Sequence, residues 1–167
     1  MTSSYPQEPW VKVLPTDAFD NPRLAEILEF WHLKRGDRPM PSRQDFDPLE
    51  MKQDLGWIVL VDVESNPTRF RYRLIGTSIT QLVGRDATGA YLDELYQGSV
   101  ETIATMSFRK LLTTRTPNRI LGTMHHAKKG HLSFEAIDLP LSSDGETVDM
   151  IMVRSVFQPW RRSEGPA

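Results

Sequence analysis

The amino-acid sequence predicts an α+β domain built on an antiparallel sheet of five strands. Two continuous apolar runs, 57–63 and 150–153, are typical of strands that are buried on both faces and lie inside a sheet. A third segment, 70–75, alternates apolar and basic side chains like a strand with one solvated face. Two more segments, 22–34 and 100–114, carry apolar residues at helical spacing. The sheet is therefore expected to pack against helices.

Length and composition are those of a small globular protein. The chain has 167 residues, of which 39% are apolar and 25% charged. This length predicts one domain with tails. We expect an N-terminal arm over residues 1–20, a single domain over 21–160 and a polar C-terminal tail over 161–167.

Charge and hydropathy argue against several classes of partner. The formal net charge of −2, without a basic run, offers no attraction to nucleic acid. No apolar stretch approaches the ~20 residues that span a bilayer. The chain has no cysteine, which excludes disulfides and thiolate metal sites. A cysteine-free chain is compatible with a reducing cytoplasm, where we expect the protein to work.

The first helix is predicted over Pro22 to Lys34. Asp20-Asn21 supplies a capping residue, proline suits the first helical position, and Gly36 can end the helix. Its apolar side chains form one wide face that consists of Leu24, Ile27, Leu28, Phe30, Trp31 and Leu33. Such a face must dock on the sheet or on a second copy of the chain, because it is too apolar to stay in water.

A short helix is predicted to follow Asp47 and to end near Gly56. Asp47 can cap it, Pro48 takes its first position, and Glu50 can reach back as in a capping box. The first apolar strand comes next. Turn residues at 65–68 then return the chain to the strand at 70–75, whose basic side chains favour the edge of the sheet.

The segment 70–95 has an uncommon order: a strand, a break at Gly76, and two very short helices. The first of these helices stops at Gly84, a plausible left-handed cap. Asp86 is expected to accept backbone hydrogen bonds within this tight segment. Arg85 is expected to pair with Asp86 or with the last carbonyls of the preceding helix.

The second half of the chain predicts a longer helix and three strands. The helix over 100–114 begins after Ser99 and stops at Thr116-Pro117. One face of it carries Val100, Ile103, Ala104, Ser107 and Leu111. The strands are expected at 118–126, 131–139 and 147–158, joined by a hairpin loop at 127–130 and a turn at 142–145.

Two stretches resemble the PAS domain. Leu-Val-Gly-Arg-Asp at 82–86, followed by Leu-Asp-Glu-Leu at 92–95, is similar to the PAS consensus between its second strand and its long helix. Pro-Ser-Arg-x-Asp-x-Asp-Pro at 41–48, before a short helix and an apolar strand, resembles a family of small stand-alone bacterial PAS-like proteins. The resemblance covers 24–159 and implies the strand order 2-1-5-4-3. That order places the first and fifth strands inside, in agreement with the two apolar runs.

The resemblance implies short and long helices on one face of the sheet. Something must cover the other face, and the first helix is the long apolar helix that remains. We expect it to pack there, within one chain or exchanged with a second. The expected homodimer interface consists of Leu24, Ile27, Phe30, Trp31, Leu33 and Trp160.

The resemblance also implies a sensory or regulatory module that binds a small apolar or amphipathic ligand without a covalent bond. The ligand would lie between the long helix and the sheet, and the signal would pass to a partner protein. The expected lining, with Tyr91 and Ser107 as its polar contacts, is Tyr91, Met106, Ser107, Leu111, Met124 and Phe134. The alternative is an interaction module that dimerises or docks on a partner and fills its core with its own side chains. No arrangement of residues supports an enzyme.

The familiar PAS cofactors are not favoured by this sequence. PAS domains that bind flavin photochemically need a cysteine on a short helix, and the chain has none. Haem-binding PAS domains commonly take their ligand from a histidine on or near the long helix, and none falls within 100–114. His125, His126 and His131 flank the hairpin loop, yet no nearby carboxylate or cysteine completes a metal site. A solvated hairpin tip is the simpler interpretation of these histidines.

Overall fold

A computed structural model describes residues 10–125 and 128–160. The described chain forms one six-stranded sheet in which every pair of neighbouring strands is antiparallel. In spatial order the strands are β1 (Val11–Leu14), β4 (Asn118–Met124), β5 (Lys129–Leu141), β6 (Met150–Pro159), β2 (Ile58–Glu64) and β3 (Arg69–Ile75). When β1 is left out and the other strands are numbered 1 to 5 along the chain, this is the predicted order 2-1-5-4-3, read from β3 to β4. Residues 1–9 of the expected arm, His126 in the expected hairpin and the whole expected tail, 161–167, lie outside the described residues.

The prediction of five strands was wrong, because the segment expected to be an arm contributes a sixth. Val11 to Leu14 pair with β4, with Val11 opposite Gly122. A four-residue run between Pro9 and Pro15 is too short to show a strand period by itself. Its pairing depends on an edge of β4 that exists only once the sheet has formed.

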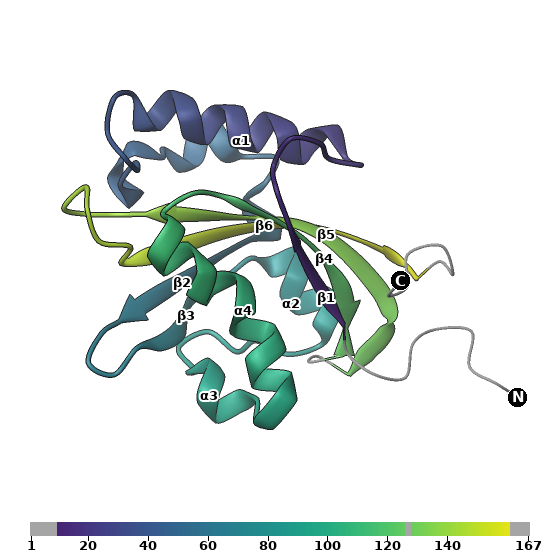
Figure 1. Ribbon diagram of the computed structural model, residues 1–167. Helices are drawn as coiled ribbons and strands as arrows, with labels where there is room; N and C mark the ends of the chain where they lie inside the picture. The colour runs from purple at the N-terminus through teal and green to yellow at the C-terminus, as the bar shows by residue number, and fades with distance from the viewer. Residues whose placement is uncertain (1–9, 126–127, 161–167) are drawn as a thin grey trace, which may run out of the picture.

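Helices lie on both faces of this sheet, as Figure 1 shows. One face carries the first α-helix of the chain, and the other face carries the three remaining α-helices. The α-helices are α1 (Pro22–Arg35), α2 (Thr77–Val83), α3 (Leu92–Leu95) and α4 (Gly98–Thr114). Three short 3-10 segments connect α1 to β2, namely η1 (Arg43–Asp45), η2 (Pro48–Met51) and η3 (Leu55–Trp57). No helix in the described ranges is long and apolar enough to cross a membrane.

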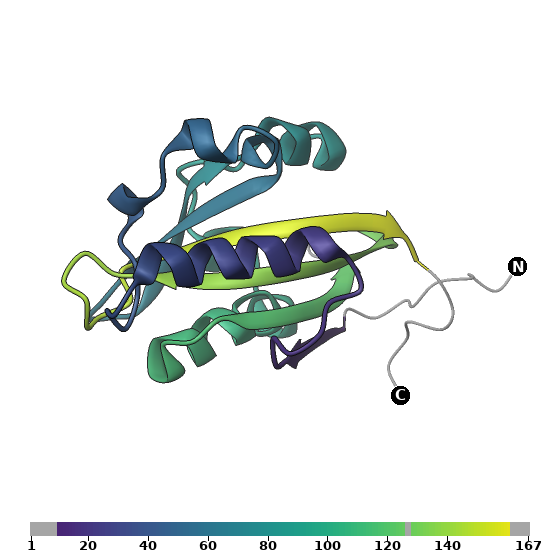
Figure 2. The same ribbon diagram turned by 90° about the horizontal axis from the view of Figure 1, so that it is seen from above.

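Helix α1 packs on the sheet within the same chain. Its predicted bounds are confirmed to within a residue, with the Asn21 side chain capping the first turn and Gly36 ending the helix at φ 58°. Leu24, Ile27 and Trp31 are buried. Seen from above, α1 runs over β5 and β6 (Figure 2), and the indole nitrogen of Trp31 donates to the Pro140 carbonyl at 2.9 Å.

Two buried carboxylates fix the position of α1. Glu135 on β5 accepts the backbone N–H groups of Asp20 and Asn21, each at 2.9 Å, just before the helix begins. Asp54, between η2 and η3, bonds Arg23 on α1 and Arg154 on β6. Both carboxylates are almost fully buried. Hydrogen bonds to them therefore hold α1 in place in addition to its apolar face.

The segment after α1 differs from the expected helix. Asp47 does cap it, since its side chain accepts the Leu49 N–H at 2.9 Å. The turns that follow, however, are the short 3-10 segments η2 and η3. Glu50 does not reach back as in a capping box but pairs with the Lys34 ammonium at 2.7 Å, which ties η2 to α1.

Candidate ligand-binding cavity

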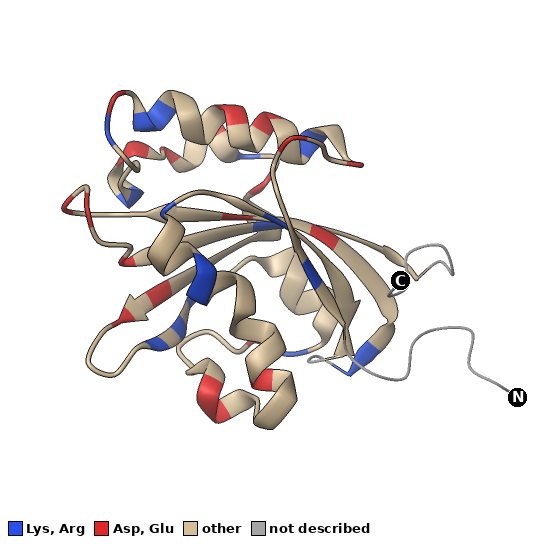
Figure 3. Ribbon diagram, viewed as in Figure 1, with Lys and Arg blue, Asp and Glu red and all other residues tan. Residues whose placement is uncertain are grey.

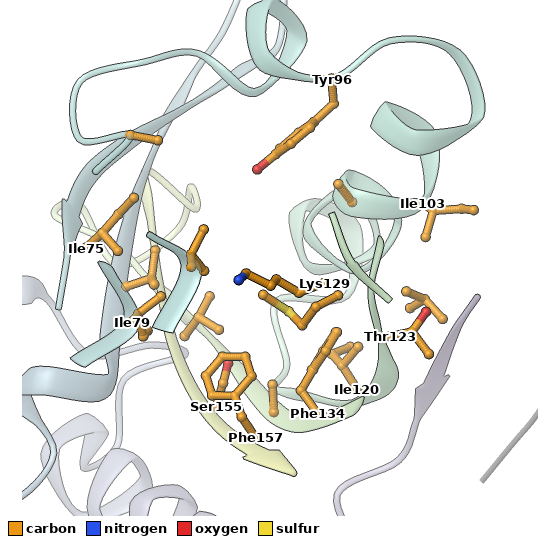
Figure 4. A pocket seen from close by; sticks show the side chains of 18 of the residues that line it. Ile75, Ile79, Tyr96, Ile103, Ile120, Thr123, Lys129, Phe134, Ser155 and Phe157 are labelled. Carbon is orange, nitrogen blue, oxygen red and sulfur yellow. The ribbon is translucent and has the colours of Figure 1, made fainter. Parts of the chain in front are cut away.

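A cavity of about 540 Å³ lies between α4 and the sheet face opposite α1. Its walls come from α2, α4 and all six strands, together with the segment around Tyr96. The close view in Figure 4 shows aliphatic and aromatic side chains surrounding this space. The labelled apolar ones are Ile75, Ile79, Ile103, Ile120, Phe134 and Phe157.

Strand alternation explains how the sheet supplies two different faces. On β5, Phe134, Ala136 and Asp138 line the cavity, and the residues between them face α1 or the core beneath it. On β6, alternate residues from Val153 to Phe157 line the cavity in the same way. Strand β6, one of the two that read as apolar on both faces, therefore has a ligand-sized space on one side and α1 on the other.

Helix α4 presents its predicted face to the cavity. Val100, Ile103, Ala104 and Ser107 line it, and Leu111, the next residue of that face, is fully buried beyond it. The helix begins at Gly98, slightly earlier than predicted. Because Ile103 lines an open space, it is only half-buried, although its helical spacing predicts a core residue.

Two tyrosines line the cavity beside each other. Tyr72 on β3 and Tyr96, which follows α3, both line the cavity and share a hydrogen bond between their side chains. Burial raises the pKa of Tyr72 well above its usual value, and Tyr96 raises it further. The Tyr72 phenol therefore stays neutral at ordinary pH. In Figure 4 the hydroxyl of Tyr96 points into the cavity.

A buried polar cluster closes one part of the cavity wall. Asp138 on β5 lies opposite Asn118 on β4 and is hydrogen-bonded by Ser107 on α4. The Asn118 amide donates to the hydroxyl of Ser107 at 3.2 Å. Burial raises the pKa of Asp138 to about 7, although the Ser107 hydrogen bond acts in the opposite direction. This carboxyl can therefore gain or lose a proton near neutral pH.

The structure brings three of the six expected lining residues together. Ser107, Met124 and Phe134 line the cavity. Tyr91 lies outside it, because its hydroxyl bonds Glu64 at 2.9 Å and its ring lies under the Arg69 guanidinium. Met106 faces outward with 38% of its surface exposed, and Leu111 is enclosed in the core. Whether any of the six binds a ligand stays a prediction.

Several polar cavity residues were not expected from the sequence. Asp138 shares the period-two face of Phe134, so alternation along the strand contains the signal for it. Lys129 was expected in the hairpin loop, but it is the first residue of β5 after a register shift near Met124. Tyr96 follows a helix of four residues, and no sequence period predicts the direction of its side chain.

His125 and His131 lie apart from the cavity lining that the structure describes. His125 bonds the Thr123 hydroxyl at 2.7 Å, and its ring occupies the space that a side chain at Gly130 would need. His131 is exposed. Within the described ranges, no group of three or more histidine or acidic side chains could hold a metal ion.

The residues expected at a dimer interface are divided between the core and the surface. Leu24, Ile27 and Trp31 are buried within the chain against the sheet. Phe30 packs edge-on against Phe46, with ring centroids 5.6 Å apart. Leu33 is 75% exposed. Trp160 is half-buried, and its backbone N–H bonds the His131 carbonyl at 2.9 Å.

Comparison with known proteins identifies the family. No curated protein matches this chain. The family model of the PAS domain, in contrast, matches residues 19–153, from just before α1 into β6. The match includes the long helix and most of the strands around the cavity. Because it spans most of the 167 residues, the chain belongs to the PAS domain family.

Proposed function

We propose that this protein is a sensory or regulatory PAS module that binds a small, mostly apolar molecule and passes the signal to a partner protein. The observation that carries the proposal is the cavity of about 540 Å³ beneath α4. Protein interiors are otherwise close-packed, and ligand sites are mostly apolar spaces of this size with a few polar groups. The proposal assigns no reaction to the chain.

A separate observation supports an interaction surface on the opposite side. Leu33 on α1 and Leu49 on η2 are 75% and 71% exposed. The ion pair between Lys34 and Glu50 joins these two elements beside the leucines. We propose that this surface binds a second copy of the chain, which keeps the expected homodimer but moves its centre to the exposed side of α1.

Filling the cavity tests the ligand-binding role. Ala104→Trp places a large side chain in the cavity, whereas Thr102→Trp adds the same bulk on the exposed side of α4. Native mass spectrometry of the full chain is expected to show a bound small molecule in the wild type and in Thr102→Trp. The same measurement on Ala104→Trp is expected to show the bare chain.

Binding of an apolar fluorescent probe provides a second measurement on the same variants. The wild type and Thr102→Trp should bind the probe, and Ala104→Trp should not. A wild-type chain that carries no small molecule and gives no thermal shift with a library of apolar compounds would favour the interaction module instead.

A further inference from the structure

The charged side chains of the cavity are unequally distributed. Its lining contains three cations, Arg85, Lys128 and Lys129, and one carboxyl group, Asp138. Figure 3 shows both acidic and basic residues spread over the helices and strands. The excess of positive charge is therefore a property of this cavity rather than of the whole molecule, whose formal net charge is −2.

Lys129 directs its charge into the cavity. In Figure 4 its ammonium points toward the middle of the space, and the Tyr96 hydroxyl points there as well. A lysine that only had to reach water would direct its ammonium away from an apolar wall. The ammonium of Lys129 instead faces a wall made largely of isoleucine, valine and phenylalanine side chains.

Lys129 and Arg85 have no counter-charge in the described part of the chain. The ion pairs of the described residues use other cations throughout. Asp86, the neighbour expected to pair with Arg85, instead accepts the backbone N–H and the hydroxyl of Thr88. Arg85 lies near enough to Tyr72 to act on its phenol electrostatically, which places a second cation on the Tyr96 side.

The single carboxyl group lies elsewhere along the wall. Lys129 is the first residue of β5, whereas Asp138 lies toward the other end of that strand, beside Ser107. The segment between them contributes Phe134 and Ala136 to the lining. The cavity therefore has a cationic end, an apolar middle and a weakly acidic end.

We propose that the cavity takes an amphipathic carboxylate, an apolar acid whose carboxylate binds Lys129 and whose chain lies among the apolar side chains of β4, β5 and β6. This inference rests on the proposed ligand-binding function and adds the chemical class of the ligand. An ammonium in apolar surroundings is costly when unpaired, and a ligand carboxylate provides a charge-assisted hydrogen bond. Arg85 supplies a second positive charge to the lining. Ionised Asp138 repels a carboxylate, so the head group is oriented toward Lys129.

Three probes with the same alkyl chain separate the head-group preference from the apolar contribution. Decanoate, decanol and decylamine are titrated into the full chain by isothermal calorimetry. Decanoate is expected to bind the wild type about tenfold or more tightly than decanol, the size of effect given by one hydrogen bond to a charged group. Decylamine is expected to bind more weakly than decanol, because its ammonium meets Lys129 and Arg85.

Substitution of Lys129 tests the position of the head group. Lys129→Met is expected to weaken decanoate binding about tenfold or more and to leave decanol binding unchanged. Lys129→Arg keeps the charge and should retain decanoate affinity. Lys110→Met removes the same charge from the exposed surface of α4, outside the cavity lining, and should change neither affinity.

The outcomes distinguish this inference from the function on which it rests. A wild-type chain that binds none of the three probes overturns both. Equal binding of decanol and decanoate, or full decanoate affinity in Lys129→Met, overturns the carboxylate proposal and leaves the apolar cavity as a ligand site. If Lys129→Met does not fold, Lys129→Gln and the wild-type probe series give the same decision.

Discussion

The carboxylate of Asp54 accepts a hydrogen bond from Nε of Arg154 at 2.9 Å, at a point where both side chains are buried. Arg23 on α1 binds the same carboxylate, with its Nε 3.0 Å from Oδ1. Burial alone would raise the pKa of Asp54, but the hydrogen bonds from Arg23 and Arg154 outweigh it and hold that pKa below its usual range. One acidic group thus joins α1, the segment before β2, and β6.

Asp54→Asn should be strongly destabilising, because it leaves Arg154 buried without a counter-charge. We expect a loss of about 3–5 kcal/mol in the free energy of unfolding, measured by urea denaturation. Asp47→Asn, at an exposed helix cap where asparagine serves equally well, should change it by less than about 0.5 kcal/mol. Similar midpoints for the two variants would mean that the Asp54 cluster contributes little to holding α1.

The stability of the protein should fall as pH rises from about 4 to about 7, through Asp138. Its pKa is about 7 in the folded chain, against ~3.9 when unfolded, so the unfolded state loses this proton first and is favoured by rising pH. The upper bound of this contribution is about 4 kcal/mol, and it is constant above the folded pKa.

Two variants isolate that contribution in urea denaturation between acidic and alkaline pH. Asp138→Asn removes the titrating group, so its stability should depend less on pH and exceed that of the wild type on the alkaline side. Ser107→Ala removes the hydrogen bond that lowers the pKa of Asp138, so the fall should extend to higher pH. Parallel pH profiles for all three proteins would contradict the titration of Asp138 near neutrality.

Two apolar residues on the same face of α4 should differ in their effect on stability. Ile103→Ala removes atoms that face the cavity, and we expect a loss of about 1 kcal/mol or less in the ligand-free chain. Leu111→Ala removes a fully buried side chain and should cost about 2–5 kcal/mol. Equal losses in denaturant melts would indicate that α4 packs directly on the sheet at Ile103.

The exposed side of α1 should determine the assembly state. Leu33→Glu places a charge in the proposed interface between copies and should convert a dimer to a monomer, read as molar mass by light scattering after gel filtration. Leu74→Glu, at an exposed leucine on β3, should leave the mass unchanged. A wild-type chain that elutes as a monomer at high concentration would refute the homodimer.

The order of the sheet was expected from the resemblance to the PAS domain, and the burial pattern of two strands agreed with it. The runs at 57–63 and 150–153 are apolar at every position or nearly so, and such strands belong in the middle of a sheet. In the structure they become β2 and β6, which are neighbours. The helical period of α4 likewise placed Val100, Ile103, Ala104 and Ser107 on the correct face. Strand β1 was missed because four residues carry no clear strand period, and the strand forms only by pairing with β4.

The site was predicted less completely than the fold, for local physical reasons. Phe134 was expected from the resemblance, and period-two alternation along β5 places Asp138 on the same face. Lys129 follows a register irregularity at the hairpin, where counting along the strand no longer fixes the face. Tyr96 and Arg85 come from irregular backbone beside very short helices, where side-chain direction depends on tertiary packing. These three residues supply much of the cavity's polarity.

Neither margin of the sheet offers a free line of backbone hydrogen bonds along its full length. At one side the edge strand is β1, which has only four residues and pairs with β4, and the Trp10 carbonyl accepts the Thr123 N–H. At the other side the chain at 89–91 bonds the middle of β3, with Gly89 and Ala90 both paired to Tyr72. Growth of the sheet by strand addition from another molecule is thereby obstructed at both ends. Association between copies that leaves this fold intact must then use side chains on its surfaces, and such contacts can be redesigned one residue at a time.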